Sequence, residues 1–266
     1  MSVVRANLGS MVAIGAHVRS DDPLAEARES GAQAVQFFLG DPQGWKKPVE
    51  HPFAADLRAS ELPRYVHAPY LVNVATRNNK IRIPSRKILT QHAAAAADIG
   101  ARGLIVHGGH LNAGDDPAEG FANWRKVFER DEFPLPILIE STAGGDNAIA
   151  RRFDRLARLW DAVGEFGVGF CLDTCHAYCG GEPLDDVVDR VLAITGRIDL
   201  VHANNSRDAF DSGADRHANF DAGTIDPQLI AHVCAAAKSD VIVETPGGVD
   251  GTGEDMRYLQ EHLAKA

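Results

Sequence analysis

Short apolar runs alternate with longer amphipathic stretches along this chain. The runs are continuous and rich in β-branched or aromatic residues, which is typical of strands buried on both faces. Eight runs are present, at 11–15, 34–39, 63–66, 103–106, 135–139, 168–172, 198–201 and 240–243. The stretches between them predict helices at 23–30, 85–100, 115–130, 148–164, 184–195, 226–238 and 255–265.

Eight strand-then-helix units in one chain of 266 residues predict an α/β fold, a (β/α)8 TIM barrel. An open doubly wound sheet has the same alternation and is the alternative. No linker, low-complexity tract or short repeat interrupts the pattern, so residues 1–266 are predicted to form a single domain. Residues 1–10 are interpreted as an N-terminal extension before the first strand.

The composition, with 45% hydrophobic and 24% charged residues, is that of a globular protein with its own core. No apolar run of about 20 residues is present, which excludes a membrane span. Four cysteines without a recognisable secretory signal favour free thiols and a cytoplasmic location. The net charge of −10 argues against nucleic-acid binding, unless basic groups and bound cations gather on one face.

Candidate ligands follow most of the predicted strands. Imidazole or carboxylate groups come after seven of the eight runs: His17, His67, His107, Glu140, Asp173 with His176, His202 and Glu244. A further pair, Asp215 and His217, follows the polar loop 206–213. The carboxyl ends of barrel strands share one rim, and this rim carries the active site in such enzymes. The sequence therefore predicts that these side chains converge there.

Such a ring of carboxylates is costly to bury unless cations compensate it. Imidazole and carboxylate groups together suit zinc, manganese or iron. The ring holds more ligands than one ion can use, which predicts two or three divalent ions. Hydrolysis of a phosphate ester is the usual chemistry of such a centre, because one ion activates water while others hold the phosphate and the leaving oxygen.

The segments around these residues resemble the endonuclease IV family, the zinc-dependent apurinic/apyrimidinic endonucleases with a TIM-barrel fold. They run in family order from the first strand to the last: Gly15-Ala-His-Val18, His67-Ala-Pro-Tyr-Leu-Val-Asn73, Val106-His-Gly-Gly109, Ile139-Glu-Ser-Thr-Ala-Gly144, Cys171-Leu-Asp-Thr-Cys-His176, Val201-His-Ala-Asn-Asn205, Asp215-Arg-His217 and Val243-Glu-Thr245. The block around Asp173 and His176 is the most specific of them. Asn205 departs from the family, which usually has Asp there.

The resemblance implies three Zn²⁺ ions per chain, with Mn²⁺ as an alternative in one site. The implied ligand sets are His67, His107 and Glu140 for the first ion, Glu140, Asp173, His202 and Glu244 for the second, and His176, Asp215 and His217 for the third. The implied catalytic residue is Glu140, which bridges the first two ions. The implied reaction is cleavage of duplex DNA on the 5′ side of an abasic site, leaving a 3′ hydroxyl and a 5′ deoxyribose phosphate. Trimming of blocked 3′ ends is also implied.

Candidate DNA contacts lie after the third predicted strand. By resemblance, Tyr70 and Leu71 match the loop that wedges into DNA at the lesion. The following stretch, 77–87, holds five basic residues and no acid, which suits contact with phosphates. The predicted DNA-binding residues are Tyr70, Leu71, Asn73, Arg77, Lys80 and Arg82.

Two other functions fit parts of the pattern. Xylose-isomerase-like sugar isomerases or epimerases use a metal set that Glu140, Asp173, His202 and Glu244 would supply. Such an enzyme has no need of the remaining ligands or the basic stretch, which favours the nuclease. A non-catalytic, metal-containing DNA-binding protein is the third hypothesis. A monomer is expected, because a DNA-facing rim needs no partner chain.

Overall fold

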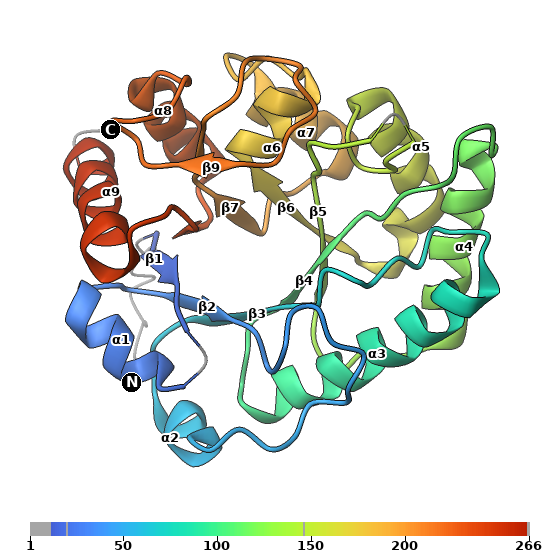
Figure 1. The fold of residues 1–266 in the computed structure, drawn as a ribbon, viewed down its shortest axis with the longest axis horizontal. Helices are drawn as coiled ribbons and strands as arrows, with labels where there is room; N and C mark the ends of the chain where they lie inside the picture. The colour runs from blue at the N-terminus through green and yellow to red at the C-terminus, as the bar shows by residue number, and fades with distance from the viewer. Residues whose placement is uncertain (1–11, 20, 146, 265–266) are drawn as a thin grey trace, which may run out of the picture.

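The computed structural model describes residues 12–19, 21–145 and 147–264, and it forms a closed barrel of parallel strands (Figure 1). Around the barrel the strand order is β1-β10-β7-β6-β5-β4-β3-β2. Their bounds are β1 (Ile14–His17), β2 (Val35–Phe37), β3 (Arg64–His67), β4 (Leu104–His107), β5 (Ile137–Glu140), β6 (Gly169–Asp173), β7 (Leu200–His202) and β10 (Asp240–Val243). β1 pairs with both β2 and β10, so the predicted barrel is confirmed and the open sheet is wrong.

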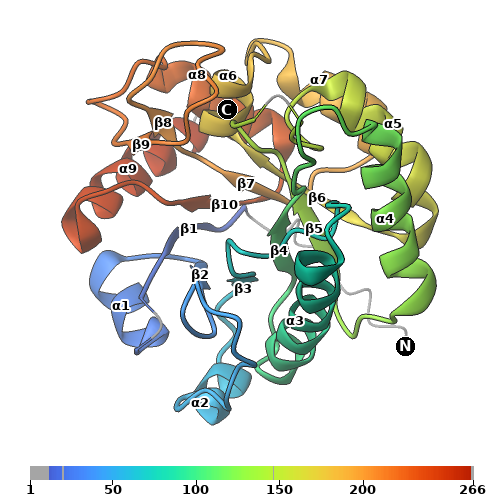
Figure 2. The same cartoon turned by 45° about the vertical axis from the view of Figure 1, so that its right-hand side comes forward.

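Helices surround the barrel on its outer side (Figures 1 and 2). They are α1 (Pro23–Ser30), α2 (Ala54–Ala59), α3 (Asn79–Asp98), α4 (Pro117–Arg130), α5 (Phe153–Val163), α6 (Thr174–Gly180), α7 (Val187–Thr195), α8 (Pro227–Ala237) and α9 (Gly248–Leu263), with a 3₁₀ turn η1 (Gly164–Phe166). A short antiparallel pair, β8 (Asn205–Ser206) and β9 (His217–Ala218), lies outside the barrel. No helix in the described ranges is both long and apolar enough to cross a membrane.

All eight predicted strands exist, but several helix boundaries differ from the prediction. α3 begins at Asn79 and not at Ser85, because Asn78 caps it by accepting a hydrogen bond from the Lys80 amide. The Ser85 hydroxyl instead accepts a hydrogen bond from the Asn73 amide, at 2.9 Å. α5 begins at Phe153 because residues 148–152 form a turn, and α9 begins at Gly248, ahead of the predicted start. The predicted extension at 1–10 lies outside the described residues.

The apolar side chains form two layers. A large cluster fills the space between the strands and the outer helices. A smaller cluster fills the barrel interior with one residue from each of seven strands or their ends: Ala34, Tyr65, Ile105, Leu138, Cys171, Leu200 and Ile242. Because side chains on a strand alternate between faces, the residue two positions further on points into the same interior, one layer closer to the carboxyl ends.

His92 is an exception in the outer layer. It lies on α3, within the helix predicted at 85–100, and it is buried, with 2% of its surface exposed. Neither of its ring nitrogens has a hydrogen-bond partner. Burial lowers the His92 pKa to about 4, because the apolar surroundings disfavour the charged ring. The folded protein therefore holds this imidazole neutral.

We expect His92→Leu to make the protein more resistant to acid. As the pH falls below the unfolded pKa of 6.5, the unfolded chain takes up a proton at His92 that the folded protein refuses until about pH 4. Stability is thus lost in that window, by about 2 kcal/mol between pH 7 and pH 5. Denaturant unfolding at both pH values should show the variant gaining this amount relative to wild type. The matched control His232→Leu, at an exposed position on α8, should show no such gain.

Candidate metal centre

The candidate ligands occupy the interior layer at the carboxyl ends of the strands. Each lies two residues after a member of the interior apolar cluster: His67, His107, Glu140, Asp173, His202 and Glu244, together with Gln36 on β2. The period of two along each strand therefore turns a ring of apolar residues into a ring of polar residues one layer higher. The barrel therefore brings these six candidate ligands together at one rim, as the sequence predicts.

The first group consists of His67, His107 and Glu140, whose ligand atoms lie within 4.8 Å of one another. The Nε2 atoms of His67 and His107 lie 3.0 and 3.2 Å from Oε2 of Glu140. His67 Nδ1 lies 2.7 Å from the Ala68 carbonyl oxygen, which fixes the proton on Nδ1 when the ring is neutral. Its Nε2 lone pair is then directed at the centre, as a metal ligand requires.

The second group consists of Glu140, Asp173, His202 and Glu244, again within 4.8 Å. His202 Nδ1 lies 2.9 Å from Oε1 of Glu140 and 3.3 Å from Oε2 of Glu244. The other ring nitrogen, Nε2, bonds to the amide oxygen of Gln36 at 2.7 Å. Glu140 belongs to both groups, with one carboxylate oxygen facing each of them.

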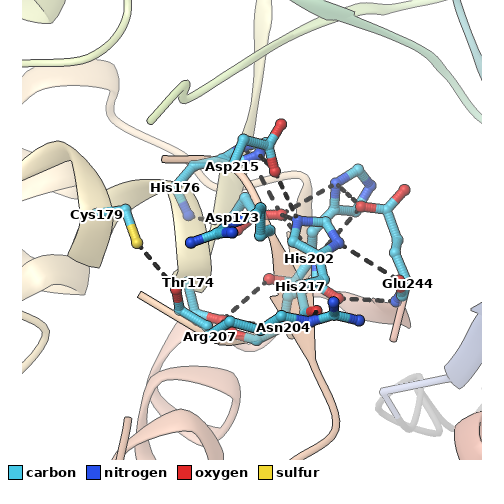
Figure 3. A network of polar contacts seen from close by, with 12 residues as sticks. Asp173, Thr174, His176, Cys179, His202, Asn204, Arg207, Asp215, His217 and Glu244 are labelled. Atoms are coloured by element: carbon cyan, nitrogen blue, oxygen red, sulfur yellow. Dashed lines mark hydrogen bonds and ion pairs between the residues drawn. The ribbon is translucent and has the colours of Figure 1, made fainter. Parts of the chain in front are cut away.

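The third group consists of His176, Asp215 and His217. The Nε2 atoms of the two imidazoles lie 3.0 and 3.3 Å from Oδ1 of Asp215, and Figure 3 shows the three side chains facing one another. Both Nε2 atoms are buried and have no hydrogen-bond partner of good geometry. His176 Nδ1 lies 2.9 Å from the Ser141 carbonyl oxygen, which leaves its Nε2 as the lone-pair nitrogen. A divalent cation would satisfy both orphaned nitrogens.

The burial of these acids and imidazoles changes their proton affinity. Burial raises the Glu140 pKa, but the positive charges of His202 and His107 outweigh it and hold that pKa well below the usual range. Burial lowers the His202 pKa, but Cys171, Glu244 and Glu140 raise it well above its usual value. The centre therefore binds cationic charge strongly, and a divalent ion can take the place of these protons.

Two residues that the sequence analysis missed hold the ligands in place. Gln36 donates to Glu244 Oε1 at 2.7 Å, bonds to His202, and lies 2.9 Å from His17 Nδ1. Asn204 donates to Asp173 Oδ2 at 2.7 Å and to Glu244 Oε2 at 3.2 Å. An available signal was Gln36 itself, a polar residue within an apolar strand. His17 contacts Glu244 at 3.4 Å, beside the three groups and not within them.

The predicted DNA contacts line one side of this centre. Tyr70 is half-exposed (51%), and its ring stacks on His107 with 5.8 Å between centroids. Tyr70, Leu71 and Asn73 line a cavity of about 830 Å³ that reaches His107, His176 and Asp215. Asn73 is buried and donates to the His110 carbonyl oxygen at 2.9 Å, so in this structure it braces the loop.

The basic stretch 77–87 contains no acid, but acidic residues from elsewhere in the chain pair with part of it. Arg77 pairs with Asp115 and Glu119, at 3.1 and 2.7 Å, because the loop after β4 and the first turn of α4 bring these acids alongside. Arg82 donates to the Thr76 carbonyl oxygen at 3.2 Å, and Lys80 is exposed at the start of α3. Their role toward DNA remains a prediction.

Asn205, where the family usually has Asp, has a local explanation. Its amide nitrogen donates to the carbonyl oxygens of Phe220 and Ile225, at 2.9 and 2.8 Å. Its oxygen accepts from the amides of Ser206 and Ile225, both at 2.8 Å. Phe220, one of its two carbonyl partners, is buried against Tyr258 of α9. Asn205 thus holds the loop that carries Asp215 and His217, and Asn204 is the residue in contact with the candidate ligands.

The comparisons with known proteins agree with this geometry. Residues 24–262 match the family described as "Xylose isomerase-like TIM barrel", which defines the class of the fold. The chain is 55% identical over 250 residues to the probable endonuclease 4 of Mycobacterium marinum, covering 94% of this chain and 98% of that protein. It is 56% identical over 248 residues to the probable endonuclease 4 of Mycobacterium tuberculosis, covering 93% and 98%. The chain therefore belongs to the endonuclease IV family of DNA-repair hydrolases, which confirms the predicted resemblance.

Solved structures agree with both the TIM-barrel fold and the endonuclease IV family. The endonuclease IV of Thermus thermophilus superposes with a TM-score of 0.82 at 28% identity, covering 96% of this chain and all of that one. A D-tagatose 3-epimerase-like protein superposes with a TM-score of 0.79 at 16% identity, covering 96% and 98%. The second likeness shows the shared barrel only.

We expect Asn205→Asp to destabilise the protein by about 2 kcal/mol or more, because the Phe220 and Ile225 carbonyl oxygens lose their donors and a charge is buried. Denaturant unfolding at pH 7 measures this loss. Asn147→Asp removes a single, more exposed hydrogen bond and should cost under about 0.5 kcal/mol. Equal stabilities of the two variants would contradict the assigned role of Asn205.

Proposed function

We propose that the centre holds three divalent metal ions, Zn²⁺ by the chemistry of its donors, with Mn²⁺ as an alternative in one site. The observation that carries this proposal is Glu140, whose two carboxylate oxygens face two different ligand groups. The orphaned nitrogens of His176 and His217 support the third ion. The proposed ligands are those of the three groups: His67, His107, Glu140, Asp173, His176, His202, Asp215, His217 and Glu244.

The proposed reaction is hydrolysis of a phosphodiester in duplex DNA, on the 5′ side of an abasic site. Bound divalent ions supply an activated water at neutral pH and a positive surface for the phosphate. Glu140 orients the first two sites relative to each other, which makes it the residue on which catalysis depends most. The products would be a 3′ hydroxyl and a 5′ deoxyribose phosphate, and blocked 3′ ends are proposed as further substrates.

The surroundings of the centre support a DNA substrate. Tyr70 presents an exposed aromatic face beside His107, where it can fill the gap that a missing base leaves in a stacked duplex. The cavity next to it has room for an extruded sugar and borders two of the three ligand groups. Extrusion of an abasic sugar costs little, because no base pair is lost.

The sugar isomerase hypothesis explains only part of the site. Glu140, Asp173, His202 and Glu244 would suffice for such an enzyme. It leaves the other five candidate ligands without a role, although they converge as closely as the first four: His67, His107, His176, Asp215 and His217. The nuclease uses all of them, and the relatives named endonuclease 4 favour the same function.

The direct test is incubation with a duplex oligonucleotide that carries one tetrahydrofuran abasic analogue. We expect a single incision 5′ of the analogue, three divalent ions per chain by elemental analysis, and loss of incision in a chelator with recovery on adding zinc. The chelated protein should also unfold at a lower temperature, because its buried carboxylates lose their counter-ions. Absence of incision in both zinc and manganese would exclude this function, and fewer than three ions would favour the isomerase.

We further expect Glu140→Gln to abolish incision while the barrel stays folded. The amide keeps the size of the side chain but removes the charge that two ligand groups share. Single-turnover incision should fall more than about a hundredfold, with metal content reduced and the circular dichroism spectrum unchanged. Glu132→Gln, at an exposed position outside the helices, is the control and should cleave like wild type.

A further inference from the structure

A second cavity lies at a different part of the rim from the large one, and the two have no lining residue in common. It has a volume of about 570 Å³ and is lined by the ends of β1 and β2 and by the start of α9, including His17, Arg19, Phe38, Thr245, Gly248 and Thr252. A smaller cavity of about 240 Å³, lined by His17, Tyr70, His217, Glu244 and Thr245, touches the centre itself. Because the two share His17 and Thr245, they form a path from the metal centre to α9.

The N-terminus of α9 opens onto this path without a side-chain cap. Gly247 and Gly248 have φ values of 98° and 61°, a left-handed backbone that leads the chain into the helix, and the acid in its first turn, Asp250, is exposed. The first amides of a helix have no partner within it, and the helix dipole adds positive potential there. This 16-residue helix therefore directs unpaired N–H donors toward the cavity, where an oxyanion can accept them.

Thr245 gives an independent indication of a ligand. It is 5% exposed, lines both cavities, and its hydroxyl has no hydrogen-bond partner among the described residues. A buried hydroxyl without a partner is unfavourable, so native proteins usually satisfy it. Thr245 and Gly248, the first residue of α9, line the same cavity, so an oxygen acceptor there can meet this hydroxyl and the helix amides.

The outer wall of the cavity carries one basic residue, Arg19, and two acidic residues, Asp21 and Glu26. The Arg19 side chain is 81% exposed, and its Nε lies 3.4 Å from Oε2 of Glu26. Asp21 lines the same wall. The weak Arg19–Glu26 contact leaves most of the guanidinium donors open to solvent, so Arg19 can turn to an anion in the cavity while Glu26 competes for it.

We propose that this cavity, which we call the α9 subsite, binds the phosphodiester group adjacent to the scissile one in the same DNA strand. The inference rests on the proposed nuclease function, which places the scissile phosphate at the metal centre. The α9 subsite shares His17 and Thr245 with the smaller cavity that reaches Glu244, and it offers a hydroxyl, helix amides and a guanidinium. An extruded sugar occupies the large cavity on the other side of Tyr70, so the strand crosses the centre from one cavity to the other.

The test compares three variants on one abasic duplex under steady-state conditions. Arg19→Gln should raise KM about five- to tenfold and leave kcat within about twofold, and it should lower the salt dependence of binding by about one phosphate contact. Thr245→Val, which keeps the shape and removes the hydroxyl, should raise KM about fivefold. Glu26→Gln should lower KM, because it frees Arg19. Arg28→Gln, which removes an exposed charge on the outer helix α1, should change nothing.

Replacing single DNA phosphates by an uncharged linkage identifies the phosphate that Arg19 contacts. One methylphosphonate linkage is placed in turn at each phosphate beside the lesion, and at one of these positions the penalty of Arg19→Gln should disappear. An unchanged KM in both Arg19→Gln and Thr245→Val, or a penalty that persists at every methylphosphonate position, would overturn the α9 subsite. Wild-type protein that incises no abasic duplex would instead refute the proposed function, so the two failures are distinguishable.

Discussion

The structure depends on one buried carboxylate at the centre of the barrel. Glu140 is 1% exposed, and its two oxygens face imidazoles from three other strands, at His67, His107 and His202. A charge at this depth is stable only if cations surround it, so the strands must deliver their imidazoles to this one point. The same constraint makes the site a receptor for divalent ions, because the imidazoles that neutralise Glu140 are also good metal ligands.

Uncharged polar residues make this concentration of charge compatible with a folded core. The side-chain amides of Gln36 and Asn204 donate hydrogen bonds to carboxylate oxygens of the centre, and Gln36 also bonds to the His202 ring. Asn205 performs the corresponding task for the loop, bonding to Phe220 and Ile225. Asp215 and His217 of the third group can therefore lie on a long connection outside the barrel, because the backbone of that connection is held at several points.

The barrel itself does not decide the function. A D-tagatose 3-epimerase-like protein shares its architecture, so the difference between a sugar enzyme and a nuclease must lie in the side chains at the rim. In this chain the rim adds the third ligand group and an exposed Tyr70 between two cavities. The net charge of −10 is compatible with DNA because four of the acids lie in the proposed ligand groups, where bound ions would reverse the local charge.

The sequence alone determined the eight strands, their order along the chain and the polar residues at their ends, because buried parallel strands leave continuous apolar runs. It also contained the layer of candidate ligands, since a period of two links each of them to the apolar residue before it. Only the tertiary structure decided which candidate ligands share a group, that Gln36 and Asn204 brace them, that Asp115 and Glu119 meet Arg77, and that His92 is buried. These facts depend on closure of the barrel and on loop paths, which bring together residues that no local pattern connects.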